Sequence, residues 1–174
     1  MIDPHTKPDG ELYADYHRRR WGGDGWTAPM KRMGRAEGAP YANWKIWPNT
    51  HHASRLLLEA GRHGLGDAVI GRLYRACYEE GENVSRKEVV AAVAREAGVP
   101  NGDEYVLSGK GTDELAAELA NAATSGGRRV RAAPTFELRA GASPALAFSG
   151  ARETDEWLSL LHEAAEAAKP SAGA

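Results

Sequence analysis

Hydrophobic positions along most of the chain recur at the three- and four-residue spacing of amphipathic helices. This spacing predicts short helical segments separated by glycine and proline, at residues 11–20, 29–36, 50–63, 67–80, 85–97, 101–109 and 112–124. Asn49 or Thr50 is expected to cap the third segment, because either side chain can accept a hydrogen bond from a free N–H of a first helical turn. Ser85 and Glu88 form a capping-box pattern before the fifth.

After residue 127 the hydrophobic period changes from helical to two. Phe136 and Leu138 alternate with polar residues, and Leu146 and Phe148 flank a small one, so two strands joined by a loop at 140–144 are expected. A last helix at 152–168 follows. Its helical spacing predicts that it buries Trp157, Leu158, Leu161 and Ala165.

Composition and charge exclude several classes of protein. The 174 residues are 42% hydrophobic and 26% charged, which fits one globular domain or one domain with an insertion. A net charge of -2 argues against bulk attraction to nucleic acid or to an anionic membrane. No apolar run is long enough to cross a bilayer, and residues 1–5 lack the pattern of a secretory signal. One cysteine permits no disulfide framework, so we expect a cytoplasmic protein.

Four short motifs occur in a fixed order along the chain. They are Asn49-Thr50 followed by Ala53-Ser54-Arg55-Leu56, then Leu73-Tyr74-Arg75-Ala76-Cys77-Tyr78-Glu79-Glu80-Gly81, then Ala133-Pro134-Thr135-Phe136, and finally Phe148-Ser149-Gly150-Ala151. They resemble N-T-x-x-A-H-R-L, L-F-x-A-Y-F-x-E-G, V-P-T-F and a strand closed by an S-G-A turn. These are motifs of the DsbA-like thioredoxin family, in its FrnE and 2-hydroxychromene-2-carboxylate isomerase branch. One departure is Ser54, which replaces the family's His.

The resemblance implies a thioredoxin-like α/β fold of the DsbA type with a large α-helical insertion and a sheet incomplete at its N-terminus. Residues 1–8 would be the remnant of a strand, 9–127 the insertion, 128–169 the C-terminal β-β-α part and 170–174 a disordered tail. The family's first strand–helix unit, which carries Cys-x-x-Cys, has no counterpart here. We therefore expect no catalytic residue in this chain.

The resemblance also implies a substrate site. The Ala133–Pro134 bond would be cis, and the Ala133 backbone would pair with a peptide or glutathione as an added strand. Asn49 would lie in the ligand cleft. Ser149, Gly150 and Ala151, beside a helix N-terminus, would hold a carboxylate such as that of glutathione.

Three functions follow as expectations. The first is a DsbA/FrnE-like thiol–disulfide oxidoreductase, truncated or inactive as written because the dithiol is missing. The second is a glutathione-dependent isomerase or transferase of the 2-hydroxychromene-2-carboxylate isomerase or kappa type, with glutathione as co-substrate and no other cofactor. The third is a non-enzymatic protein that binds a peptide, or one whose sheet is completed by a second copy of the chain or by another partner. No nucleic-acid or membrane partner is expected.

For the cysteine, two histidines and four of the tryptophans we favour a structural role over a chemical one. Cys77 lies on an apolar helix face, where a free thiol behaves as a small hydrophobe. His51 and His52 are adjacent and point in different directions on a helix, so we expect no metal site and solvated imidazoles. Four tryptophans near Arg18-Arg19-Arg20 are expected to form an aromatic cluster rather than a base-stacking surface; they are Trp21, Trp26, Trp44 and Trp47. A ligand cleft lined by the same cluster, between the helical insertion and the sheet, is the alternative.

Overall fold

The computed structural model describes residues 5–125, 128–130, 132–141 and 145–168. The chain divides into two compact units, one ending at Leu115 and the other beginning at Ala116. Several predicted features lie outside the described residues, namely the start of the strand remnant at 1–4, the Gly126-Gly127 linker, the loop centre at 142–144 and the tail at 170–174.

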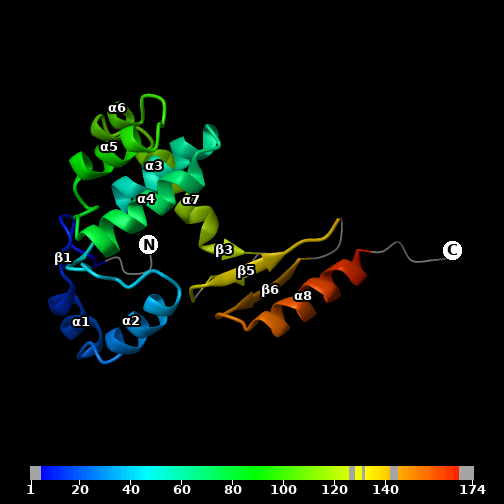
Figure 1. Cartoon of the computed structure of the whole chain (residues 1–174). Coiled ribbons are helices and arrows are strands. Elements are labelled where there is room, and N and C mark those ends of the chain that lie inside the picture. The colour runs from blue at the N-terminus through cyan, green and yellow to red at the C-terminus, as the bar shows by residue number, and fades with distance from the viewer. Residues whose placement is uncertain (1–4, 126–127, 131, 142–144, 169–174) are drawn as a thin grey trace. The chain divides into compact units, whose positions relative to one another are not determined.

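The first unit is almost entirely helical (Figure 1). Its elements are β1 (Glu11–Leu12), α1 (Tyr13–Trp21), α2 (Thr27–Ala36), β2 (Ile46–Trp47), α3 (His51–Arg62), α4 (Gly66–Tyr74), the π-helix η1 (Arg75–Glu80), α5 (Lys87–Glu96), α6 (Gly102–Leu107) and the first turn of α7 (Thr112–Ala122). Its core is aliphatic and comes from α3 to α6. Leu56, Val69, Val90 and Ala94 are completely buried there.

Two predicted helix boundaries are wrong. Glu11 and Leu12 form β1 rather than a helical turn, because they pair with Trp47 and Ile46 of β2. The segment predicted as one helix from 67 to 80 changes at Arg75 from an α-helix to a π-helix. Neither change is visible in local periodicity, since both depend on which segments meet in the folded unit.

The two predicted caps behave differently. Thr50 is the N-cap residue of α3 and makes no cap hydrogen bond with its side chain, whereas Asn49, one residue earlier, accepts the His51 N–H through its Oδ1 at 3.0 Å. Ser85 does not cap α5: its Oγ accepts the Asn49 N–H at 2.8 Å, and Arg86 occupies the N-cap position. The capping-box prediction is therefore wrong. The serine hydroxyl instead ties the start of α3 to the segment before α5.

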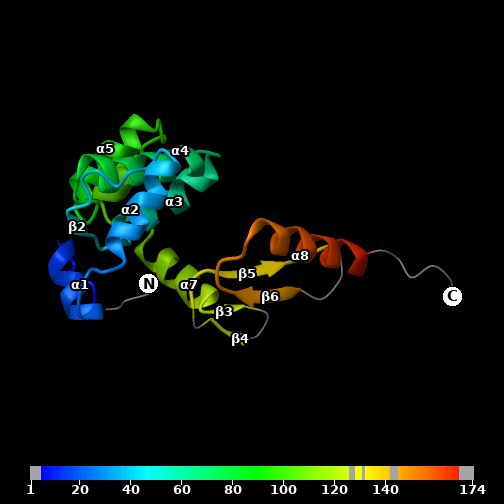
Figure 2. The same cartoon turned by 60° about the horizontal axis from the view of Figure 1, so that its bottom comes forward.

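The second unit contains two antiparallel hairpins and a helix (Figures 1 and 2). Its elements after α7 are β3 (Thr124–Ser125), β4 (Arg128–Arg129), β5 (Thr135–Leu138), β6 (Leu146–Ser149) and α8 (Thr154–Ala167). In the β5–β6 pair Phe136 lies opposite Phe148, and Thr135 lies opposite Ser149. The two strands predicted from their period of two are confirmed.

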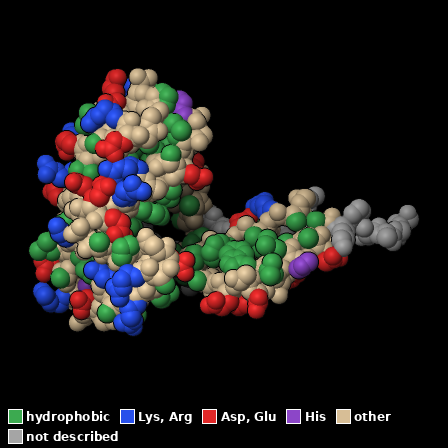
Figure 3. Space-filling model, viewed as in Figure 1, with side chains coloured by type: hydrophobic (Ala, Val, Ile, Leu, Met, Phe, Trp, Pro, Cys, Tyr) green, Lys and Arg blue, Asp and Glu red, His purple; other side chains and the backbone are tan. Residues whose placement is uncertain are grey.

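The buried face of α8 was predicted wrongly for three of its four residues. Trp157 is partly buried as expected, but Leu158 is 54% exposed, Leu161 is 50% exposed and Ala165 is exposed. The helix carries two neighbouring apolar stripes, and the stripe of Trp157, Leu160 and Ala164 is the less exposed one. Hydrophobic side chains accordingly gather on the visible surface of the β5–β6–α8 part (Figure 3).

Candidate functional site

The Ala133–Pro134 segment forms an exposed backbone edge directly before β5. The bond between these residues is cis, and both residues are exposed. Among the described residues β5 pairs only with β6, and no hydrogen bond joins the N–H or C=O of Ala133 to another described residue. Free backbone groups on an accessible strand edge are the elements that pair with an added extended peptide.

The Ser149-Gly150 turn lies against this edge. The Gly150 N–H donates to the Pro134 carbonyl at 2.9 Å, and the hydroxyls of Thr135 and Ser149 are 2.8 Å apart. Thr135 Oγ1 also donates to the Ala132 carbonyl at 2.7 Å. Gly150 has φ +92°, a conformation that glycine adopts without a steric penalty. The structure thus brings Pro134, Ser149 and Gly150 together.

Three aromatic rings, from β5, β6 and α8, pack against one another next to this site. Phe136 and Phe148 stack with their centroids 5.3 Å apart, and Trp157 of α8 meets them edge-on at 4.7 and 5.4 Å. Such edge-to-face contacts favour a defined ring geometry. The position of the hairpin therefore depends on α8.

The N-terminus of α8 is already capped by acidic side chains of the protein, so it offers little to the carboxylate of a ligand. Glu153 and Glu156 form a reciprocal capping box, and Asp155 adds another acid to the first turn. The nearby cation is Arg152, whose guanidinium lies 5.4 Å from the Phe148 ring centroid and 3.9 Å from Glu156. An anion beside Ala151 would consequently rely on Arg152 and on the turn backbone.

Asn49 belongs to the other unit and both ends of its amide are engaged. Besides accepting the His51 N–H, Asn49 donates from Nδ2 to the Thr6 carbonyl at 3.5 Å. The observed contacts of Asn49 are those of a residue that organises the start of α3.

Cys77 is not arranged as a nucleophile. It is 5% exposed in the core of the helical unit, and burial raises the pKa of its thiol to about 12. The thiolate, the reactive form, is therefore scarce at neutral pH. This agrees with the prediction that Cys77 serves as a small hydrophobe.

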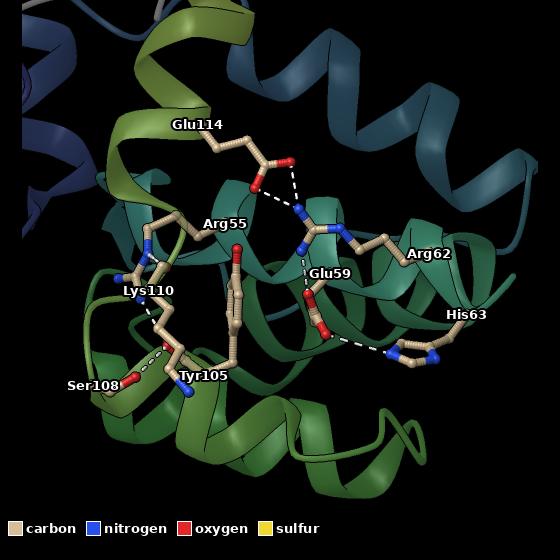
Figure 4. A network of polar contacts seen from close by, with 8 residues as sticks. All are labelled: Arg55, Glu59, Arg62, His63, Tyr105, Ser108, Lys110 and Glu114. Carbon is tan, nitrogen blue, oxygen red and sulfur yellow. Dashed lines mark hydrogen bonds and ion pairs between the residues drawn. The ribbon is translucent and has the colours of Figure 1, made fainter.

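Sequence reasoning missed the role of Arg55, which joins α3 to α6 (Figure 4). Its side chain is buried and donates to the carbonyls of Lys110, Tyr105 and Val106 at 2.7, 3.0 and 2.9 Å. A fourth donor meets His52 Nδ1 at 3.0 Å. His52 is therefore not the solvated residue that was predicted. The clue in the sequence was Arg55 itself, a charge beside an apolar helix stripe.

A second set of polar contacts lies next to Arg55 and is exposed. Arg62 pairs with Glu59 and Glu114, and Glu59 also meets His63 at 3.4 Å (Figure 4). Exposed pairs of this kind contribute little to stability. Within the described ranges no three His, Cys, Asp or Glu side chains converge on a metal-sized site.

The predicted aromatic cluster is confirmed in the first unit. It encloses His17, which is completely buried, and neither of its ring nitrogens has a hydrogen-bond partner in the described part of the chain. Its neighbours are the rings of Tyr13, Tyr16, Trp21, Trp26, Trp44 and Trp47, with centroids 4.0 to 6.5 Å from the imidazole. These rings join the short α1 and α2 to β2.

The histidines make stability depend on pH. Burial lowers the pKa of His17, and burial and Arg55 lower the pKa values of His51 and His52. Protonation, which begins in the unfolded chain near pH 6.5, thus favours unfolding. The free energy of unfolding should be highest above that pH and fall as the pH drops from 7.5 to 5.5.

Urea unfolding followed by tryptophan fluorescence at both pH values checks this expectation. His17→Phe should reduce the pH-dependent loss, because it removes the buried imidazole without charging the site. An equal loss in the wild type and His17→Phe would contradict the role given to His17.

Comparison with known proteins identifies relatives of the chain. The model of the DSBA-like thioredoxin domain matches residues 23–161. A crystal structure of a probable DsbA oxidoreductase from Streptomyces coelicolor is similar with a TM-score of 0.75 and 20% identity, over 99% of this chain and 76% of that one. No functionally curated protein matches significantly. No described helix has the length and apolarity needed to cross a bilayer.

Proposed function

The chain belongs to the DSBA-like thioredoxin domain family, and from this we propose that it provides the substrate-binding side of a DsbA/FrnE-type thiol–disulfide oxidoreductase. The family and the thioredoxin-like fold predicted from the motifs are confirmed. The observation that carries the proposal is the exposed Ala133–Pro134 edge, with the Gly150 N–H bound to the Pro134 carbonyl beside it.

Substrate binding follows from the free backbone groups. An extended peptide that carries a cysteine adds to the edge as a strand, pairing with the N–H and C=O of Ala133. The hydrogen bonds among Thr135, Ser149 and Ala132 hold the edge in place, so peptide binding costs little conformational entropy of the protein. Main-chain pairing binds many sequences, which suits a protein acting on varied disulfide substrates.

Thiol–disulfide exchange needs a thiolate that attacks one sulfur of a disulfide and displaces the other as a thiolate. Cys77 is the single cysteine of these 174 residues, and its buried thiol has a pKa raised to about 12. Residues 1–174 alone therefore bind substrate without exchanging its disulfide. A single cysteine forms no internal disulfide, which fits a reducing compartment such as the cytoplasm.

Glutathione is the second candidate for the same edge, as in a glutathione-dependent isomerase or transferase. The observation in its favour is Arg152, a cation that directly follows the Ser149-Gly150-Ala151 turn and would attract a glutathione carboxylate bound at that turn. In that case glutathione supplies the missing thiol.

A titration followed by amide chemical shifts tests both candidates. One arm uses a short extended peptide with an S-methylated cysteine, and the other uses reduced glutathione. We expect the peptide to shift the amides of Ala133 and Gly150, and Pro134→Ala to weaken this response. A stronger response to glutathione, weakened by Arg152→Gln, favours the second candidate. No saturable shift at this edge with either compound overturns both.

A turbidity assay tests the catalytic part. Residues 1–174 should not accelerate insulin reduction beyond dithiothreitol alone, because no accessible thiolate is present. Acceleration that is lost in Cys77→Ser would contradict the assignment of Cys77 as an inert core residue.

A further inference from the structure

A cavity opens on the helical unit, among residues other than those that carry the proposed function. It has a volume of about 220 Å³ and lies between the first half of α3 and the α4–η1 segment. Its walls are formed by Pro48, Thr50, Ala53, Ser54, Leu57, Ile70, Leu73, Tyr74, Cys77, Tyr78 and Val84. All of these residues belong to the first unit, so the cavity is defined by that unit alone.

The walls carry no charge. None of the lining side chains is acidic or basic, and burial raises the pKa values of Cys77 and Tyr78 to about 12, so both remain neutral. Aliphatic groups form most of the surface, and Tyr74, which is 55% exposed, borders it. A ligand here must be apolar over most of its surface.

Ser54 and Cys77 belong to different helices, yet both line this cavity, each with a small side chain.

Two hydroxyl groups at the cavity are available to a ligand. Among the described residues, neither Thr50 Oγ1 nor Ser54 Oγ takes part in a hydrogen bond within the protein. Both belong to the first turn of α3 or its N-cap, on one side of an otherwise apolar space. A polar substituent on a ring can therefore be satisfied without leaving the cavity.

We propose that this cavity binds a single-ring aromatic alcohol of the phenol class, with the ring against Leu73 and Cys77 and its hydroxyl at Ser54. The volume fits, since an engineered apolar cavity of about 150 Å³ already accepts benzene. The site requires no catalytic residue and is independent of the Ala133–Pro134 edge.

Titration of the isotopically labelled chain with phenol tests the proposal. Phenol should cause saturable shift changes at the amides of Ala53, Leu73 and Cys77. Ser54→Ala should weaken phenol binding by about fivefold, as expected for one lost hydrogen bond, and leave fluorobenzene binding unchanged. Cys77→Tyr, which places a ring in the cavity, should abolish the response to both compounds.

Two results would overturn the proposal. One is phenol binding that persists in folded Cys77→Tyr. If that variant does not fold, Ser54→His makes the same test, because Ser54 is half-buried on α3 and tolerates a larger side chain more easily. The other is a wild-type response that is absent or centred on Ala133 and Gly150. Loss of peptide binding at that edge has no bearing on this cavity, so the two proposals fail separately.

Discussion

Replacing Arg55 with Met should lower the free energy of unfolding of the helical unit by about 3 kcal/mol or more. Arg55 is 1% exposed, and its guanidinium donates to the carbonyls of Tyr105, Val106 and Lys110 at the end of α6 and in the loop after it. Met fills similar space but donates nothing, so the Lys110 carbonyl loses its partner, and the carbonyls of Tyr105 and Val106 keep only the Ser108 hydroxyl and the Gly109 N–H. Each buried acceptor left without a partner costs roughly 1–3 kcal/mol.

Chemical denaturation monitored by far-ultraviolet circular dichroism measures this loss. Arg62→Met is the matched control, because Arg62 lies on the same helix and its contacts with Glu59 and Glu114 are exposed. The control should change stability by less than about 1 kcal/mol. Equal effects of the two substitutions would show that the contacts of Arg55 do not hold α6 in place.

Arg55 also shows where sequence reasoning ends. Helix positions follow from apolar spacing, which is local, and the predicted helices were largely correct. The partners of Arg55 are 50 to 55 residues further along the chain, and no local pattern indicates them. The same holds for Ser85, whose local capping pattern is overridden by the Asn49 N–H from a distant segment.

The candidate site was predictable in its residues but not in its contacts. The motifs single out Pro134, Ser149 and Gly150, and the structure places them side by side. The hydrogen bond between Thr135 and Ser149 depends on strand register, which the length of the connecting loop alone does not fix. Two alternating segments imply a hairpin, whereas the choice between two apolar stripes of α8 depends on Trp157 fitting the Phe136–Phe148 pair.

That fit leads to the second large effect: Trp157→Ala should unfold the β5–β6 hairpin while the helical unit stays folded. A two-stranded sheet is marginal in water without a packed face, and here the packed face is the contact of Phe136 and Phe148 with Trp157. Removing a large aromatic side chain from such a contact costs about 3 kcal/mol. Few other contacts in this small unit can offset that loss.

Hydrogen exchange of the backbone amides distinguishes the two units. In Trp157→Ala, protection should be lost at Phe136 and Ala147 and retained at Val90 in the helical core. Leu158→Ala is the control, because Leu158 is the next residue on α8 and is 54% exposed, so it should change protection little. Loss of protection at Val90 as well would mean that the units unfold together. Unchanged protection at Phe136 would mean that the hairpin does not depend on the tryptophan, and the edge at Ala133 would then owe its order to the strand hydrogen bonds themselves.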